Sequence, residues 1–192
     1  AVFPRSGLPR SGTHLLFQLL YLITFWGHDN VVDPGDVSVP PYYPDTPFCR
    51  RDWANGLEQM QLVDREVGAI LGRLDDEGLA DNTIVFFIGD HGRCHIRGKQ
   101  FLYDGGIRIP MIMRWPGRIK PGSTSDSLVC LSDMMATFAA ITGYKLANDI
   151  GEDSYNAWPA FLGSEEVVRT SIIHQDISGT LGIRDGRWKW IQ

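Results

Sequence analysis

The apolar positions in the middle of the chain predict a long helix followed by a buried strand. Apolar residues between positions 57 and 74 recur at steps of three and four with charged residues between them, which is the period of an amphipathic helix. We expect this helix to end near Gly78. Residues 83–88 form an unbroken β-branched and aromatic run, which is typical of a strand buried on both faces of a parallel sheet. The strand runs directly into Gly89-Asp90-His91-Gly92, so ionisable side chains follow its end.

The second half of the chain predicts shorter elements. Residues 110–115 have the composition of another buried strand. Ser132 and Asp133 are residues that can cap a helix, which we expect to continue through Ala140. A second short helix is predicted at residues 157–162. Helices therefore alternate with buried strands along this part of the chain, as they do in α/β proteins.

The C-terminal tail predicts antiparallel strands at residues 171–174, 181–184 and 187–191, with a turn at Asp185-Gly186. We expect this hairpin to be added to the main sheet. The tryptophans of its last strand are expected to pack in the interior, because large aromatic side chains dominate cores by area. The fold class predicted from these patterns is α/β, with a small appended antiparallel sheet.

Composition places the chain among globular proteins and excludes several classes of partner. It has 192 residues, of which 43% are hydrophobic and 21% charged, enough for a core of ordinary size. Eighteen Lys and Arg against 23 Asp and Glu give a net charge of -5, so no basic field attracts nucleic acid. Cys49, Cys94 and Cys130 show neither the paired spacing of a zinc site nor the even number of a disulfide framework.

The N-terminal region contains an apolar run that is either a signal peptide or a buried strand or helix. Residues 15–26 are apolar except for Gln18 and Thr24, and Arg5 and Arg10 precede them, which is the outline of a signal peptide. No small-residue cleavage site follows, so a buried strand or helix is the preferred interpretation. The run is shorter than the ~20 apolar residues that a membrane span requires. We therefore expect no membrane span.

The segment 88–106 is the main candidate for a functional site. In an open α/β sheet ligands collect beyond the carboxyl ends of strands, and Asp90 and His91 fall at such an end. A carboxylate beside an imidazole, with glycine on both sides, can hold a divalent cation. The polar or cationic side chains that follow in the same segment are Arg93, His95, Arg97 and Lys99. Such a density of positive donors suits an oxyanion such as sulfate or phosphate.

Several motifs in this sequence occur together in a fixed order. They are Asp81-Asn82-Thr83, Phe86-Phe87-Ile88-Gly89-Asp90-His91-Gly92, the run 98–110 beginning Gly98-Lys99-Gln100, Arg114-Trp115-Pro116-Gly117 and Ile183-Arg184-Asp185-Gly186-Arg187-Trp188-Lys189. In this order they resemble the C-terminal half of a sulfatase of the arylsulfatase type, within the alkaline-phosphatase-like superfamily. The resemblance extends from about Asp36 to Gln192. It implies a partial α/β/α sandwich with a small C-terminal antiparallel sheet, and an enzyme that hydrolyses sulfuric esters.

The resemblance also implies roles for individual residues. Asp90 and His91 stand where the family has ligands of a calcium ion, with His91 in the catalytic set. Lys99 matches the lysine that holds a sulfate oxygen, where a fixed positive charge stabilises the charge that develops on the sulfuryl group. His28 lies roughly where the family has a further sulfate-binding histidine. The other side chains that we expect on the substrate side are His95, Arg97 and His174.

Two departures from the family pattern matter for activity. Family members carry a Cys or Ser in Cys/Ser-x-Pro-x-Arg that is oxidised to formylglycine, whose hydrate is the nucleophile. None of Cys49, Cys94 and Cys130 begins such a motif, and the paired N-terminal aspartates of the metal site are also absent. We therefore expect a fragment or a degenerate copy that is inactive alone, with the formylglycine in the missing N-terminal half.

The implied organisation has three parts: an atypical N-terminal segment at 1–30, a partial catalytic α/β domain at 31–145 and a C-terminal subdomain at 146–192. The implied cofactor is one divalent cation, Ca²⁺, and the implied partner is a sulfated small molecule or glycan. No nucleic acid is expected. The residues leave the cellular location unknown, although the resemblance implies a periplasmic or secreted location for the full-length protein.

Three alternatives remain open from the sequence. A phosphate or phosphonate ester hydrolase of the same superfamily is one, because a metal and a lysine bind all tetrahedral oxyanions in a similar way. The second is a sulfotransferase-like nucleotide-binding loop at residues 6–16, where Pro9-Arg10-Ser11-Gly12-Thr13 would cradle a phosphate at a helix N-terminus. The third is a folded remnant without chemistry.

Overall fold

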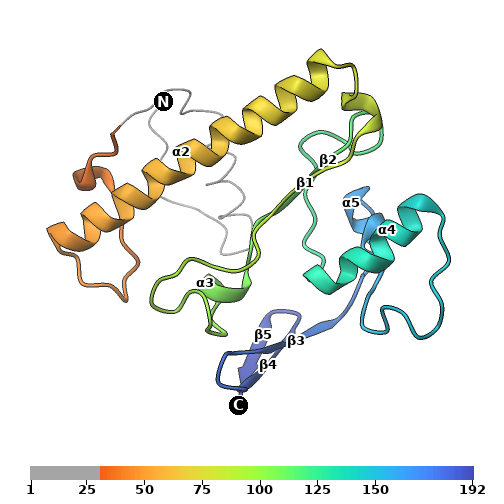
Figure 1. Cartoon of the computed structure of the whole chain (residues 1–192). Helices are drawn as coiled ribbons and strands as arrows, with labels where there is room; N and C mark the ends of the chain where they lie inside the picture. The colour runs from red at the N-terminus through yellow and green to blue at the C-terminus, as the bar shows by residue number, and fades with distance from the viewer. Residues whose placement is uncertain (1–30) are drawn as a thin grey trace. The chain divides into compact units, whose positions relative to one another are not determined.

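The computed structural model describes residues 31–192, which fall in two compact units. The first unit ends at Ala80 and the second comprises residues 81–192 (Figure 1). The apolar run 15–26, the sulfotransferase-like loop 6–16 and His28 lie outside the described residues. The boundaries expected near residues 30 and 145 stay predictions.

The first unit is dominated by the predicted long helix. After the short 3-10 helix η1 (Pro34–Asp36), helix α2 spans Pro47–Asp76. Thr46 caps it by accepting a hydrogen bond from the backbone N–H of Cys49 at 3.2 Å, and Pro47 occupies the first turn, where a missing N–H costs nothing. The helix ends just before Gly78, as the sequence predicts.

The N-terminal half of α2 carries the core of this unit. Glu58 accepts a hydrogen bond from the backbone N–H of Val32 at 2.9 Å, and Arg50 donates to the carbonyl of Val37 at 2.7 Å. Both contacts fasten the preceding segment to the helix. The buried apolar side chains are Val32, Val37 and Ala54, with Trp53 and Leu57 packed against them.

Two strands in the second unit position the candidate site. The short 3-10 helix η2 (Ala80–Asn82) leads into strand β1 (Val85–Ile88), which pairs with β2 (Met111–Arg114). The pairing is antiparallel, with Val85 opposite Arg114, so the expected parallel neighbour is wrong for this pair. Residues 89–110 connect the strands and return beside the end of β1, where Gly89 donates to the carbonyl of Pro110 at 3.0 Å. All four residues of β1 are half-buried rather than buried.

Two of the remaining α-helices match their sequence signals, and a third, in the loop between β1 and β2, was not predicted. Helix α3 (Asp104–Ile107) lies in the loop between the two strands, and η3 (Leu131–Asp133) leads into α4 (Met134–Thr142). Gly143 follows α4 with a φ of 70°, the left-handed conformation that glycine adopts at helix ends. Helix α5 (Trp158–Phe161) confirms the short helix predicted at residues 157–162.

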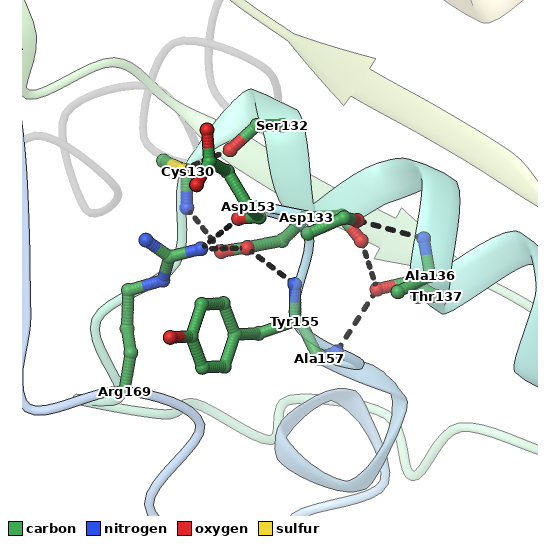
Figure 2. A network of polar contacts seen from close by, with 10 residues as sticks. Cys130, Ser132, Asp133, Ala136, Thr137, Asp153, Tyr155, Ala157 and Arg169 are labelled. Atoms are coloured by element: carbon green, nitrogen blue, oxygen red, sulfur yellow. Dashed lines mark hydrogen bonds and ion pairs between the residues drawn. The ribbon is translucent and has the colours of Figure 1, made fainter. Parts of the chain in front are cut away.

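A buried carboxylate ties α4 to the segment that follows it (Figure 2). Asp133 has no exposed surface and accepts hydrogen bonds from the backbone N–H groups of Cys130 and Tyr155 at 2.8 and 3.0 Å. Arg169 donates to the same carboxylate. Thr137, also fully buried, donates to the backbone carbonyl of Asp133 at 2.7 Å. These contacts hold the C-terminal part of the unit to α4.

The tail forms a three-stranded antiparallel sheet in the order β3 (Ser171–Gln175), β4 (Leu181–Asp185), β5 (Trp188–Ile191). Among residues 31–192 this sheet shares no strand with β1 and β2, so the expected addition to the main sheet is wrong. Trp188 and Trp190 are 71% and 74% exposed, which corrects the expectation that they pack in the interior. They occupy the outer face of a sheet that is covered on one side.

None of the helices within the described residues is long and apolar enough to cross a membrane.

Candidate functional site

The candidate site is the loop between β1 and β2. Its two ends lie together because Gly89, just after β1, donates to the carbonyl of Pro110, just before β2, at 3.0 Å. The antiparallel pair therefore holds both ends of residues 89–110. Asp90 and His91 follow the end of β1 directly, as the sequence predicts.

The interior of the loop packs backbone against backbone. Gly92 donates to the carbonyl of Gly106 at 2.9 Å, and a Cβ atom at Gly92 would lie 1.7 Å from the carbonyl oxygen of Gly105. A Cβ atom at Gly98 would lie 2.1 Å from the carbonyl oxygen of Arg93. No side chain fits at either position, so glycine allows the loop to close on itself. The loop is thereby a compact support for the side chains that it carries.

Lys99 stands at a strained point of this loop. Its backbone N–H donates to the carbonyl of Arg93 at 2.7 Å. Arg97, two residues before it, and Gln100, directly after it, have φ values of 60° and 80°, left-handed conformations that cost a non-glycine residue roughly 1 kcal/mol or more. The surrounding hydrogen bonds hold this conformation. The Lys99 side chain is exposed, and no ion pair to its ammonium group occurs among residues 31–192.

The side chains of Asp90 and His91 contact each other directly. His91 Nδ1 lies 2.8 Å from the carbonyl oxygen of Gly92, and because a carbonyl only accepts, Nδ1 carries the hydrogen. His91 Nε2 lies 3.1 Å from Asp90 Oδ2, which is an ion pair when the ring is protonated. In the neutral ring the Nε2 lone pair is available to a cation that Asp90 also binds. Asp90 Oδ1 accepts from the backbone N–H of His91 at 3.0 Å, which orients the carboxylate. A carbonyl that fixes one ring nitrogen and frees the other is the usual support of a metal-binding histidine.

Asp90 and His91 can supply some, but not all, of the ligands that a calcium ion requires. Ca²⁺ takes about six to eight ligands, mostly oxygen atoms. Within residues 31–192 no group of three or more His, Cys, Asp or Glu side chains is gathered where it could hold a metal ion. The two side chains would therefore supply only two positions of a calcium site, and calcium binding stays a prediction.

His95 and Arg97, which were predicted on the substrate side, follow Asp90 and His91 on the same loop. His95 is half-buried, and its backbone N–H donates to the carbonyl of Arg93 at 2.8 Å. The guanidinium carbon of Arg97 lies 5.1 Å from the centroid of the Tyr103 ring, within the range of a cation–π contact. Their roles toward a substrate stay predictions, and His28 lies outside the described residues.

His174 lies on β3, half-buried, on the face of the C-terminal sheet that also bears Arg184 and Lys189. Burial lowers the pKa of its imidazole, and the positive charges of Lys189 and Arg184 lower that pKa further, while Asp104 acts in the opposite direction. The ring is therefore held neutral near pH 7. Its expected contact with substrate stays a prediction.

Sequence reasoning missed a charged cluster next to the loop. Lys189 Nζ donates to the backbone carbonyl of Leu102 at 3.0 Å and pairs with the Asp104 carboxylate, and Arg184 Nη1 lies 3.9 Å from that carboxylate. Partial burial raises the pKa of Asp104, but the hydrogen bond from Lys189 and the charges of Lys189, Arg184 and Arg108 outweigh it and hold that pKa below its ordinary value.

No signal in the sequence pointed to this cluster, because the side of the strand that is covered is known only from the structure. Residues of a strand alternate between faces, so Lys189 lies on the opposite face from Trp188 and Trp190. Lys189 has only 20% of its side chain exposed, against more than 70% for the two tryptophans. A lysine turned toward the body of the unit needs a charged partner.

Comparisons of the sequence with known proteins all point to one family. A family model described as Sulfatase matches residues 18–144. An ulvan-active sulfatase of Formosa agariphila is 33% identical over 162 residues, which cover 81% of this chain and 26% of the relative. An N-acetylgalactosamine-6-O-sulfatase of Bacteroides thetaiotaomicron is 31% identical over 151 residues, which cover 68% of this chain and 29% of the relative. The chain thus spans little more than a quarter of the length of these curated relatives.

Solved structures agree in fold. A structure from work on glycosaminoglycan metabolism by Bacteroides thetaiotaomicron has a TM-score of 0.65 and 29% identity, over 82% of this chain and 37% of that chain. The structure of Ps i-CgsB in complex with k-i-k-neocarrahexaose has a TM-score of 0.63 and 26% identity, over 74% and 34% of the two chains. The α/β fold of the alkaline-phosphatase-like type, with its small C-terminal antiparallel sheet, is confirmed.

Proposed function

The chain belongs to the sulfatase family, and we propose that residues 89–106 form the part of a sulfuric ester hydrolase site that binds the sulfate group and one cation. One observation carries the proposal. Asp90, His91 and Lys99 stand on a single loop whose glycines pack backbone against backbone and whose ends are fixed by β1 and β2. Binding groups on a rigid support act without reorganising when the reaction occurs.

The residues of the loop have separable tasks in this proposal. The ammonium group of Lys99 binds a sulfate oxygen and neutralises charge as the ester bond breaks. Asp90 and His91 would hold the calcium ion through the carboxylate and through Nε2 of the neutral ring. A bound cation polarises the sulfuryl oxygens and contributes positive charge to the site. The carbonyl of Gly92 keeps the His91 ring in the orientation that this requires.

We propose a sulfated sugar as the substrate class. Support comes from relatives named for sugars, including the N-acetylgalactosamine-6-O-sulfatase described above. His95 and Arg97 follow the cation pair on the same loop, and His174 lies on β3, so these three are proposed on the substrate side. We extend this assignment to His28 on the resemblance alone.

The nucleophile is a separate matter. No Cys-x-Pro-x-Arg or Ser-x-Pro-x-Arg motif occurs in the 192 residues, so this chain offers no residue for conversion to formylglycine. We infer that the purified chain alone hydrolyses no aryl sulfate. Incubation with p-nitrophenyl sulfate tests this: release equal to a buffer blank is expected. Turnover above the blank that disappears on Lys99→Ala would show a nucleophile within these residues.

Binding of inorganic sulfate tests the proposed function without requiring turnover. Sulfate is titrated into the full chain at constant ionic strength, and the dissociation constant is compared with that of Lys99→Met. The loss of an ammonium group that contacts the anion weakens binding by about tenfold or more. Lys120→Met is the matched control, because Lys120 is an exposed lysine outside the loop.

Two results would overturn the proposal. One is equal sulfate affinity in the wild-type chain and Lys99→Met. The other is tight binding of inorganic phosphate with no measurable binding of sulfate, which would favour the phosphate ester hydrolases of the same superfamily. Sulfate binding that is lost in Lys99→Met and kept in Lys120→Met is the expected result.

A further inference from the structure

The loop that carries Lys99 is attached to the C-terminal sheet at three points. Ile177, in the turn after β3, donates through its backbone N–H to the carbonyl of Gln100 at 3.4 Å. Leu102 is 4% exposed, and its Cδ1 lies 3.0 Å from the place that a Cβ atom at Gly182 would occupy. Lys189 on β5 donates to the carbonyl of Leu102 at 3.0 Å. All three attachments fall within the three residues after Lys99.

Lys189 makes the charged attachment. It pairs with Asp104 and donates to the carbonyl of Leu102 through the same ammonium group, and its side chain is only 20% exposed. Arg184, opposite Lys189 in the β4–β5 register, adds a second positive charge 3.9 Å from Asp104. Hydrogen bonds that involve charged groups are stronger than those between neutral groups, and partial burial increases this difference.

The backbone conformation of the loop around Lys99 is strained, so contacts with another element are needed to hold it. Arg97 and Gln100, on either side of Gly98 and Lys99, adopt left-handed conformations that a free loop would leave. The segment 100–104, which follows Lys99 directly, contacts the C-terminal sheet through the backbone of Gln100 and the side chains of Leu102 and Asp104. If this segment shifts, the Lys99 backbone shifts with it.

We propose that Lys189 is a positioning residue, which acts through Leu102 and Asp104 to fix the Lys99 ammonium group where it binds sulfate. The proposal rests on the proposed function of Lys99. It makes the C-terminal sheet a working part of the sulfate site, because the sheet sets the geometry of a binding group that it does not contain. Of the two faces of β5, only the one that bears Lys189 then helps to position Lys99.

Sulfate titration of four variants of the full chain tests this proposal. Lys189→Met keeps the apolar stem and removes the charge, and we expect it to weaken sulfate binding by about tenfold. Arg187→Met, an exposed cation on the turn before β5, is the matched control and should bind as the wild type does. The double variant Lys189→Met with Lys99→Met should bind no more weakly than Lys99→Met alone, because Lys189 acts through Lys99.

Two results overturn the proposal. One is wild-type sulfate affinity in Lys189→Met. The other is a double variant weaker than Lys99→Met by the full factor of Lys189→Met, since Lys189 would then contribute to sulfate binding by itself. Urea unfolding of each variant separates a loss of sulfate binding from a loss of folding.

A second measurement separates this proposal from the proposed function. If Lys99→Met leaves sulfate binding unchanged, the function of Lys99 is wrong, and amide hydrogen exchange then decides the positioning role. Faster exchange of residues 98–106 in Lys189→Met, with unchanged exchange in α4, supports the attachment of the loop. Unchanged exchange of residues 98–106 overturns it.

Discussion

The carboxylate of Asp133, a side chain with no exposed surface, accepts a hydrogen bond from Arg169, whose guanidinium carbon lies 4.3 Å from the centroid of the Tyr155 ring (Figure 2). The arginine also donates to the carbonyl of Asp153 at 3.1 Å. Two backbone N–H groups and one guanidinium therefore surround the carboxylate. A buried charge is stable only when it is surrounded in this way.

Removal of this arginine should destabilise the fold strongly. Arg169→Met leaves the Asp133 charge buried without its partner, which costs about 3–5 kcal/mol of the free energy of unfolding. Arg118→Met is the control, because Arg118 is exposed and lies 5.5 Å from the Trp115 ring; its loss should cost about 1 kcal/mol or less. Urea unfolding followed by circular dichroism measures both. If both substitutions lower the free energy of unfolding equally, the buried pair of Arg169 and Asp133 stabilises the fold no more than an exposed arginine does.

Glycine substitutions should have opposite effects in the loop and in α2. In Gly98→Ala the new methyl group would lie 2.1 Å from the Arg93 carbonyl oxygen, so the loop must open and Lys99 moves. In Gly72→Ala the methyl group meets nothing within 4 Å, and alanine in a helix interior stabilises by about 0.5–1 kcal/mol. Thermal unfolding measures the stability of both variants, and sulfate titration measures their affinity for sulfate. Wild-type sulfate affinity in Gly98→Ala would contradict the account of the loop.

Calcium binding should depend on Asp90. Asp90→Asn removes the charge that a calcium ion prefers while the shape of the side chain is kept, so affinity should fall by about tenfold or more. Asp126→Asn, an exposed carboxylate outside the loop, is the control. Isothermal titration with calcium chloride measures both. If Asp90→Asn binds calcium as well as the wild-type chain does, Asp90 is not a ligand here.

The stability of the chain should show a pH dependence that originates at His174. Burial and the charges of Lys189 and Arg184 lower the pKa of His174 from its ordinary value of 6.5, so the folded state favours the neutral ring. This contribution is fully present above pH 6.5 and is lost as pH falls through that value toward the folded pKa, because the unfolded chain then binds the proton more readily.

His174→Gln tests this sign. Glutamine takes no proton in this range, so the variant should lose less stability than the wild-type chain between pH 7 and pH 5 (about the window set by an ordinary histidine). Asp104 faces the same cluster, but its pKa is lowered from 3.8 and affects stability only at more acid pH. Urea unfolding at several pH values gives the two profiles. Parallel profiles would contradict the role of His174.

The elements with strong local signals were predicted well from the sequence. The periodic apolar positions from Leu57 to Leu74 fall within α2, and Asp133 and Gly143 lie at the two ends of α4. The Asp133 side chain does not cap α4 as predicted, because its carboxylate accepts from the backbone N–H groups of Cys130 and Tyr155 instead. The placement of Asp90 at the end of β1 follows from a run of apolar residues that stops at Gly89. These features depend on neighbours in the sequence, so the sequence alone contains them.

The features that depend on distant residues were not predicted. An unbroken apolar run such as β1 does not reveal the direction of its partner, which the path of the 89–110 loop decides. Lys189 and Asp104 are 85 positions apart, and no local pattern links them. Trp188 and Trp190 are exposed because only one face of the C-terminal sheet is covered. The candidate site was found as a motif, while the contacts that support it required the structure.

The central claim is that the ammonium group of Lys99 binds a tetrahedral oxyanion beside Asp90 and His91. Selenate has the shape and charge of sulfate and scatters X-rays anomalously, so crystals of the full chain soaked in selenate test the claim directly. We expect an anomalous peak whose oxygen atoms lie within about 3 Å of Lys99 Nζ. A well-ordered selenate bound elsewhere, with none near Lys99 at saturating concentration, would contradict the account.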